Sequence, residues 1–286
     1  MRKLVISVLF VLLSLSISMF AWATDENQSA EEKQEEKIRG EIAAGILSAY
    51  IWRGQELSRR GVVLQPSIMV SYRDFAASLW GNLDTDPYTV GGQRNSSNFT
   101  ETDVTISYSR KFGILQAGIG YIYYGLSGST AGGADLLDSQ ELFVSLGLDT
   151  LLAPTLTVYK EIDHYHQWYG TLGISHTFSL QEKIGLRLAV SVSYLKSEDA
   201  ATYPEFDQNS VAGDKKFNNF HDGVFSVSLP VAVIKTLTIT PTLSYVFPLS
   251  DDAKYEMKGR GLKSTTNPSD RGSAYFYGGI VLSYTF

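Results

Sequence analysis

The sequence lacks cysteine, has only four histidines among 286 residues, and carries 30 acidic against 24 basic side chains. Without cysteine the chain has no disulfide scaffold, thiolate zinc site, thiol nucleophile or lipidated N-terminal cysteine. The formal net charge of −6 argues against a nucleic-acid-binding protein, which presents a basic face. Intrinsic disorder is excluded because 44% of the residues are hydrophobic and 12% are aromatic. No feature of the sequence calls for a cofactor or a metal ion.

Long apolar runs are missing except at the N-terminus. Arg2 and Lys3 precede an apolar stretch over residues 4–20, which ends in Ala21-Trp22-Ala23. A basic start, an apolar centre and small residues before the cleavage point predict a secretory signal peptide over residues 1–23, with an uncleaved membrane anchor as the alternative. No other run of about 18 apolar residues follows, so no transmembrane helix is expected beyond it.

Residues 24–40 contain few apolar side chains and are rich in Glu, Lys and Gln. Pairs of Glu and Lys could support a short helix there, but such a helix has no apolar face to bury. A solvated periplasmic tether is the preferred interpretation, and an oligomerisation coil is the alternative.

From residue 41 onward the side chains alternate with a period of two. Within 236–249 every odd position is apolar or aromatic, and hydroxyl side chains occupy the even positions as far as Ser244. Residues 184–194 and 224–231 repeat this alternation. Strict alternation predicts strands with one apolar and one polar face, and therefore an all-β protein.

About twelve strands follow from this pattern, joined in turn by short and long connections. The long connections, of 12–22 residues, are 87–99, 127–138, 198–219 and 250–271. Tight turns at one end and long polar loops at the other are typical of an outer-membrane barrel. The predicted strands cover residues 41–54, 63–74, 76–86, 100–111, 115–126, 139–150, 155–165, 167–179, 183–196, 220–234, 236–249 and 273–286.

A soluble β-sandwich shows the same alternation, because its apolar face forms the core. Aromatic placement favours a membrane barrel, in which both lipid–water interfaces select aromatic side chains. With the first strand running outward, the outer ends carry Trp52, Tyr121, Tyr123, Trp168, Tyr194, Tyr245 and Phe247. The inner ends carry Tyr72, Tyr108, Phe112, Phe178, Tyr284 and Phe286. The predicted fold is a transmembrane antiparallel β-barrel over residues 41–286.

The last predicted strand ends in Phe286, with Tyr284 and Leu282 on the same face. This ending resembles the C-terminal strand by which outer-membrane proteins are recognised for assembly. The expected partners are the barrel-assembly machinery, through Phe286, and the lipid of the outer membrane. Small hydrophilic solutes are expected inside the barrel.

Short motifs resemble those of the TorF-type porin family of bacteria. Tyr50-Ile51-Trp52-Arg53-Gly54, near the end of the first predicted strand, matches the Tyr-x-Trp/Phe-Arg-Gly motif of that family, and Gln65-Pro66-Ser67 follows in the second strand. The segment from Leu156 to Phe178 resembles the family's central hairpin. The resemblance covers most of the chain after the signal peptide. It implies an outer-membrane location and a channel role, and it carries over no substrate or catalytic residue.

Alternation places several charged residues on the predicted lumen side. The interior of a barrel of about eight strands is filled by side chains, and a barrel of 16–18 strands leaves a wide channel. A barrel of twelve strands therefore allows either a narrow pore or a plugged lumen. The predicted function is passive diffusion of small hydrophilic solutes through a channel whose acidic outer mouth favours cations, with Arg53 near its constriction. The candidate pore-lining residues are Arg53, Asp84, Asp103, Glu141, Glu161, Asp163 and Arg187.

A structural role for these charges is the alternative. Arg53 would then pair with Glu161, Asp163 or Asp103 only to neutralise a closed interior, because charges facing a region of low dielectric constant need partners. The 22-residue loops at 198–219 and 250–271 could also fold inward and close the mouth.

Two other functions stay open. A hydrolase near the extracellular rim could use His164 and His166 beside Asp163, or His221 beside Asp222. No Gly-x-Ser-x-Gly motif accompanies them, so an enzyme is not predicted. The third possibility is a non-conducting barrel that anchors surface loops. His176 falls on the predicted lipid face and is the one anomaly in the register.

Overall fold

The computed structural model describes residues 37–58, 61–86, 89–90, 93–94, 98–127, 138–209, 211–260 and 272–286. The predicted signal peptide, residues 1–23, and residues 24–36 of the predicted tether lie outside the described residues. Among the described residues, no helix is long and apolar enough to cross a bilayer.

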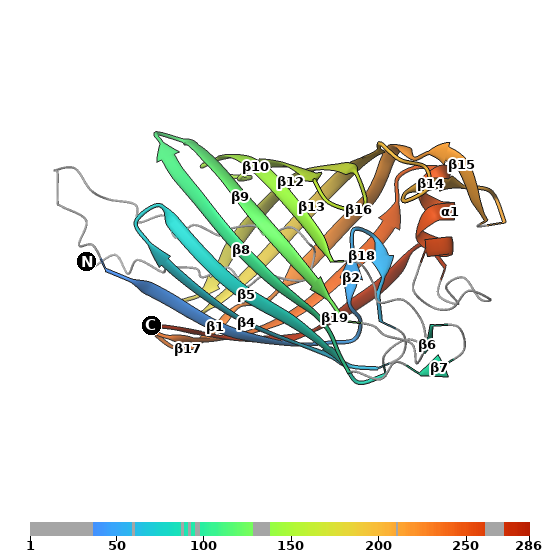
Figure 1. Ribbon diagram of the computed structural model, residues 1–286. Helices are drawn as coiled ribbons and strands as arrows, with labels where there is room; N and C mark the ends of the chain where they lie inside the picture. Colours follow the sequence, from blue (N-terminus) through green and yellow to red (C-terminus); the bar gives the residue numbers. More distant parts are fainter. Residues whose placement is uncertain are drawn as a thin grey trace.

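One antiparallel sheet closes on itself to form a barrel (Figure 1). Around the wall the strands follow the order β1, β4, β5, β8, β9, β10, β11, β12, β13, β16, β18 and β19, and β19 pairs with β1 to close the ring. The short strand β17 continues β16 between the same two neighbours, so the wall has twelve strands. The predicted twelve-stranded antiparallel barrel is confirmed.

The wall strands lie close to the predicted ranges. They are β1 (Arg39–Leu47), β4 (Val63–Tyr72), β5 (Phe75–Asp84), β8 (Phe99–Phe112), β9 (Leu115–Leu126), β10 (Ser139–Leu148), β11 (Thr155–Glu161), β12 (Gln167–Gln181), β13 (Ile184–Ser197), β16 (Asn218–Ser228), β17 (Val231–Ile234), β18 (Leu237–Pro248) and β19 (Tyr275–Thr285). The predicted strand 220–234 is interrupted before Val231 because Pro230 has no N–H to donate to the ladder.

Both ends of the described chain lie at the same end of the barrel, which is called the termini end here (Figure 1). Tight turns join the strands at this end, for example Arg73–Asp74 between β4 and β5. The opposite end, called the loop end, carries the longer connections, which include the short strands β6 (Thr89–Val90), β7 (Gln93–Arg94), β14 (Pro204–Phe206) and β15 (Ala212–Lys216).

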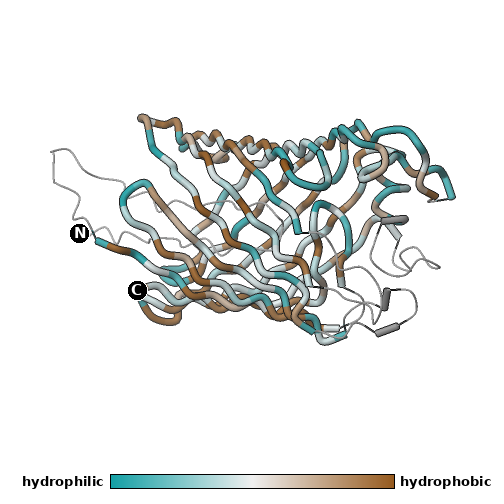
Figure 2. The backbone as a smooth tube through the Cα atoms, in the orientation of Figure 1, coloured by the Kyte–Doolittle hydropathy of each residue, from teal (hydrophilic) through white to brown (hydrophobic). Residues whose placement is uncertain are grey.

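The outer face of the wall is apolar and solvent-accessible. Hydrophobic and hydrophilic residues alternate along the wall strands (Figure 2). Outward side chains such as Ile106, Val144 and Leu172 are 50% or more exposed, which suits contact with lipid and not with water. Aromatic residues flank this band at both ends: Phe75, Phe112 and Phe286 lie at the termini end, and Trp168, Phe220 and Phe276 lie at the loop end.

The prediction that residues 41–54 form one wall strand is wrong beyond Leu47. After Leu47 the chain leaves the wall and forms a small hairpin, β2 (Ile51–Trp52) and β3 (Gln55–Glu56), inside the barrel (Figure 1). Trp52 therefore lies in the lumen and not in the outer aromatic belt. The physical reason is that residues 49–51 do not alternate: Ala49, Tyr50 and Ile51 are all apolar or aromatic and all 4% exposed or less, so this stretch packs on both sides.

The connection between β18 and β19 contains a helix that the sequence pattern did not predict, α1 (Asp251–Arg260). Ser250 caps its first turn, because its Oγ accepts the Ala253 N–H at 3.1 Å. Asp251 and Asp252 place negative charge in the first turn, where the helix dipole favours it. The helix lies at the loop end beside β14 and β15 (Figure 1).

The apolar band yields a matched test at adjacent positions of β10. Val144 is 50% exposed on the outer face, whereas Ser145 faces the lumen. We expect Val144→Arg to lower the free energy of unfolding by about 2–4 kcal/mol, because it places a charge near the bilayer midplane. Ser145→Arg should have a clearly smaller effect. Denaturant titration of the protein in lipid vesicles measures both, and equal losses would contradict the assigned faces.

Candidate functional site in the lumen

The hairpin of β2 and β3 turns at Arg53 and Gly54, which both have positive φ, at 47° and 76°. Two consecutive positive φ values are typical of the type I′ turns that close two-residue hairpins. A Cβ on Gly54 would lie 2.9 Å from both Asp222 Cβ and Met257 Cε. Glycine is therefore required here by backbone conformation and by close packing against both β16 and α1.

Arg53, at the tip of the hairpin, is 1% exposed. Its Nη2 donates to Glu141 Oε2 at 2.6 Å, and Glu141 is equally buried. The guanidinium carbon lies 4.3 Å from the ring centroid of Tyr169 and 5.3 Å from that of Tyr159, both from the wall. Trp52 of the hairpin stacks on it at 4.5 Å. Four wall residues, Tyr124, Glu141, Tyr159 and Tyr169, thus form an aromatic and acidic surround for Arg53, called the cage below.

The charge on Arg53 is held by Glu141. Arg53 lies at the hairpin tip, outside the strands that span the barrel wall. Burial disfavours the charged guanidinium and lowers its pKa. The nearby Glu141 carboxylate has the larger opposite effect, so the pKa of Arg53 is raised above its ordinary value. Among the described residues, Nε and Nη1 of Arg53 have no hydrogen-bond partner. The cage therefore satisfies the charge of Arg53 but not all of its donors.

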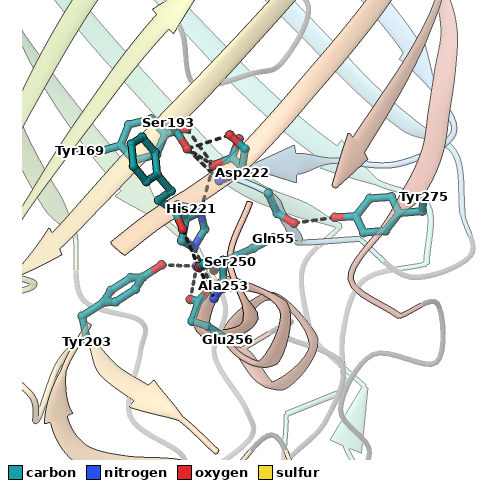
Figure 3. A network of polar contacts seen from close by, with 12 residues as sticks. Gln55, Tyr169, Ser193, Tyr203, His221, Asp222, Ser250, Ala253, Glu256 and Tyr275 are labelled. Carbon is teal, nitrogen blue, oxygen red and sulfur yellow. Dashed lines mark hydrogen bonds and ion pairs between the residues drawn. The ribbon is translucent and has the colours of Figure 1, made fainter. Parts of the chain in front are cut away.

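The wall holds the cage in place by contacts that do not involve Arg53. The Tyr124 hydroxyl donates to Glu141 Oε2 at 2.8 Å. The Tyr169 hydroxyl donates to Asp222 Oδ1 at 3.0 Å (Figure 3). Tyr159 packs between Phe143 and Tyr169, at centroid distances of 5.7 and 6.2 Å.

A second buried polar network joins the hairpin to α1 (Figure 3). His221 lies between two carboxylates, with Nδ1 2.9 Å from Asp222 Oδ1 and Nε2 2.8 Å from Glu256 Oε2. Gln55 Nε2 donates to Glu256 Oε1 at 2.8 Å and to the Tyr203 hydroxyl at 2.5 Å. Hairpin, helix and wall therefore meet at Glu256, in a region where His221 and Glu256 have no exposed surface.

Glu161 ends β11 and fixes the short connection at the loop end. Its carboxylate accepts the backbone N–H groups of residues 163, 164, 165 and 166 at 2.6–3.1 Å. Ser139 Oγ also donates to it at 3.1 Å. The connection near residues 162–166 is short because the buried Glu161 carboxylate accepts hydrogen bonds from the backbone of a compact turn.

The predicted lumen residues separate into three groups. Arg53 and Glu141 meet as an ion pair, although the sequence analysis named Glu161, Asp163 or Asp103 as the partner of Arg53; that pairing is wrong because Glu161 is engaged by its own turn. Asp163 lies in that turn, where Gln140 Nε2 donates to it at 2.9 Å.

Asp84 and Arg187 lie apart from the ion pair, whereas Asp103 pairs in the ladder with Tyr124 of the cage. Asp84 ends β5 and accepts the Asp86 N–H at 2.9 Å. Asp103 lies two residues from Glu101 on the same side of β8. Arg187 lies toward the termini end, where its Nη2 donates to Ser175 Oγ at 3.1 Å.

The interior differs between the two ends of the barrel. At the loop end the hairpin side chains Ile51, Arg53 and Gln55 are at most 4% exposed, so the lumen there is filled. Toward the termini end most inward positions carry small side chains, some buried and some partly exposed, and the larger ones among them include Met69, Gln116 and Arg187. The hydroxyl residues among them include Ser67, Ser71, Ser78, Thr105, Ser107, Ser109, Ser145, Thr155, Thr157, Ser175, Thr177, Ser191, Ser226, Ser228, Thr238, Thr240, Thr242 and Ser283.

The histidines do not form a hydrolytic arrangement. Both ring nitrogens of His221 are engaged by carboxylates, and Ser193 Oγ bonds to Asp222 at 2.7 Å. His164 Nδ1 contacts the Asp138 carbonyl at 2.8 Å in an exposed turn. Within the described part of the chain, no group of three or more His, Asp or Glu side chains is arranged to hold a metal ion.

His176 lies on the outer face, as the register predicted. Its Nδ1 is 2.8 Å from the Leu151 carbonyl in the neighbouring turn, and its ring packs edge-on against Phe178 at 4.5 Å. The turn thus gives this polar side chain a partner near the termini end, and the register of β12 needs no change.

Sequence reasoning missed the helix α1 and the role of Glu256. The signal for the helix was present in Ser250-Asp251-Asp252, a cap followed by acidic residues. The contacts of Tyr203 and Glu256 with Gln55 span 148 and 201 positions of the chain, and no local pattern reports them.

Comparisons with solved structures return other barrels at low similarity. The NanC porin is 10% identical, with a TM-score of 0.47, over 86% of this chain and 98% of that chain. The translocator domain of the autotransporter NalP from Neisseria meningitidis is 13% identical, with a TM-score of 0.40, over 92% and 90%. The Pseudomonas putida toluene transporter TodX is 11% identical, with a TM-score of 0.38, over 87% and 89%. No protein-family model and no curated protein matches the chain. At these values no property of these proteins transfers to this chain.

Glu256 should contribute strongly to stability because it bonds both His221 and Gln55. We expect Glu256→Ala to lower the free energy of unfolding by about 3–5 kcal/mol, since it leaves buried polar partners unmatched. Asp252→Ala on the same helix removes one half-buried hydrogen bond to Asn219 and should cost about 1 kcal/mol. Chemical denaturation followed by tryptophan fluorescence compares them. Similar losses for both variants would contradict the anchoring role of Glu256.

Glu161 and Asp163 give a second matched pair. Glu161→Ala removes the acceptor of four backbone N–H groups and should lower the free energy of unfolding by about 2 kcal/mol or more. Asp163→Ala removes partly exposed contacts with Gln140 and His164 and should cost less than about 1 kcal/mol. Thermal unfolding in detergent micelles ranks the two. The assignment fails if Asp163→Ala is the more damaging change.

Proposed function

We propose that the protein is an outer-membrane channel for passive diffusion of small hydrophilic solutes, with a weak preference for cations. The observation that carries this proposal is the hydroxyl-lined interior of the termini half of a twelve-stranded barrel. An eight-stranded barrel is just filled by its side chains, and barrel diameter grows roughly linearly with strand number. Twelve strands therefore give about 1.5 times that diameter, which Ser, Thr, Ala and Gly side chains are too small to fill.

The hairpin of β2 and β3 would set the narrowest part of this path. It fills the loop half of the lumen, and its backbone pairs only with itself among the described strands. A polar interior that narrows at one self-contained element suits a channel whose conductance depends on the position of that element.

The preference for cations rests on the charges near the loop end. Asp84, Glu101, Glu141 and Glu161 are buried acidic residues of the wall there. Arg53 is the one buried arginine or lysine in the part of the chain that the structure describes. An excess of acidic groups around a low-dielectric passage raises the local concentration of cations.

The location and partners belong to the same proposal. The outward apolar band and its aromatic flanks suit lipid, and a signal peptide at residues 1–23 would direct export. In that orientation the termini end faces the periplasm. Assembly would proceed through the C-terminal strand that ends in Phe286. The likeness of residues 50–54 to the TorF-type porin motif supports the same role, with Arg53 of that motif in the lumen.

A non-conducting barrel that anchors its loops is the competing function. The helix α1 and the hairpin of β14 and β15 project at the loop end, as an anchor would require (Figure 1). A polar interior is common to open and to plugged barrels, so the conductance of the protein decides between the two functions.

Conductance in planar bilayers tests the channel. Leu47 and Val63 are paired neighbours in the wall, so a short Gly/Ser linker can replace residues 49–61 without stretching the barrel. We expect small, cation-preferring steps for the wild type and steps several times larger for the linker variant. Arg53→Ala should lie between them.

The control is folding, shown by strand content in circular dichroism and by heat-dependent migration in gels. If neither the wild type nor the folded linker variant shows conductance steps, the channel proposal is wrong and the anchor function is favoured. Steps in the linker variant alone would support a channel that the hairpin closes.

A further inference from the structure

The cage of Tyr124, Glu141, Tyr159 and Tyr169 has the composition of a binding site for an organic cation. It offers one buried carboxylate and aromatic faces at 4.3 and 5.3 Å from the guanidinium carbon. Aromatic faces with a carboxylate are the surroundings that bind guanidinium and ammonium groups. These residues come from four adjacent strands, β9 to β12, so the wall alone builds the site.

The cage is formed in advance of its occupant. Tyr124 holds Glu141, Asp222 holds Tyr169, and Phe143 packs against Tyr159, all without Arg53. A site whose groups are fixed by other contacts loses little order when a ligand enters. The site should therefore keep its shape after Arg53 leaves.

The present occupant belongs to a separable element. The hairpin of β2 and β3 makes no ladder with the wall among the described strands, and side chains fix its tip. Gln55 reaches Tyr203 and Glu256, and the Tyr275 hydroxyl donates to the Gly54 carbonyl at 2.8 Å. Because Nε and Nη1 of Arg53 have no partner in the described part of the chain, the hairpin presents its guanidinium incompletely satisfied. A solute is not tethered to the hairpin, so it can turn its guanidinium group to satisfy the donors that in Arg53 lack partners.

We propose that the cage binds the guanidinium group of a small solute that enters the lumen, and that Arg53 occupies it as an internal ligand when no solute is present. This proposal rests on the channel function, since it names the class of solute. The solute would displace the Arg53 tip, ion-pair with Glu141 and stack on Tyr169. The hydroxyl-lined interior toward the termini end, where Arg187 lies on β13, would receive it next.

A purely structural role for Arg53 is the competing explanation, in which it neutralises Glu141 and never leaves. The two explanations differ for the wild type. If Arg53 is an internal ligand, ethylguanidinium added to the intact protein moves the hairpin. If Arg53 is structural, only removal of Arg53 exposes the cage.

Binding to the refolded protein in detergent tests the site without measuring flux. Ethylguanidinium is the probe and ethylurea is its neutral counterpart. We expect the Kd of ethylguanidinium to be at least tenfold lower for Arg53→Ala than for the wild type. The double variant Arg53→Ala/Glu141→Gln should bind ethylguanidinium more weakly than Arg53→Ala does. Arg53→Lys should bind it no more tightly than the wild type. Calorimetry at millimolar probe, below denaturing concentration, measures each Kd.

A second variant covers the case in which Arg53→Ala fails to fold. Gly54→Ala keeps Arg53 but places a Cβ against Asp222 and Met257, so it should shift the hairpin tip and also improve ethylguanidinium binding. A reporter protein keeps Arg53, lacks residues 1–23 with Trp22, and carries Trp80→Phe and Trp168→Phe, so that Trp52 is its one tryptophan. A saturable change in Trp52 emission with ethylguanidinium, absent with ethylurea, is the expected result.

Two outcomes overturn the site. One is that folded Arg53→Ala and Gly54→Ala bind ethylguanidinium no better than the wild type. The other is that Trp52 does not respond in the reporter protein, which leaves Arg53 a structural residue. Binding is measured at equilibrium and does not depend on flux. Either failure therefore does not affect the conductance experiment or the channel proposal. Likewise, the absence of conductance in the bilayer does not change the binding result.

Discussion

The pairing of β1 with β19 closes the ring, and every other feature of the molecule depends on that closure. A backbone in hydrocarbon has no water to satisfy its N–H and C=O groups, so an open sheet edge is not tolerated there. Closure fixes which side of each strand meets lipid and which meets the lumen. The two-residue alternation of the sequence then assigns every wall side chain to one of two environments. This is why Val144 and Ser145, adjacent in the chain, are expected to respond so differently to a charge.

Closure also creates an interior in which charge has to be matched. The loop half of the lumen holds ionisable groups that are almost without exposed surface, among them Arg53, Glu141 and His221. Such groups are stable only when each has a partner, because desolvation of an isolated charge costs several kcal/mol. The fold provides the partners from three separate pieces of chain: the hairpin, the helix α1 and the wall. The pieces are therefore held in register by charge as well as by packing.

The wall could be predicted from the sequence because its rule is local. Alternation along 236–249 predicts β18 whatever lies beside it. The same rule applied to 41–54 failed at its end, although Ala49, Tyr50 and Ile51 already break the alternation. Read strictly, that break indicates a segment buried on both sides, which a lipid-facing strand cannot be.

The contents of the lumen could not be predicted in the same way. Arg53 and Glu141 are 88 positions apart, and Asp103, Glu161 and Asp163 are equally good partners by charge and by end of strand. The choice is made by three-dimensional details: Glu161 is occupied by its own turn, and the turn at Gly54 aims Arg53 at β10. A sequence pattern reports which face a residue lies on but not how far a neighbouring loop reaches into the barrel.

The chemistry of the contacts made by the hairpin of β2 and β3 decides whether the hairpin can move away from its position in the lumen. Ile51 and the apolar residues around Met257 favour the docked position, because undocking exposes them. The contacts at the tip are polar, however, and Arg53, Gln55 and Glu141 can all be solvated if water or a cation takes the place of their partners. An interface with an apolar base and a polar tip therefore resists removal of the whole hairpin while allowing its tip to exchange. Since the tip is the part that contacts the cage, the cation site is the place where movement requires the least loss of buried apolar surface.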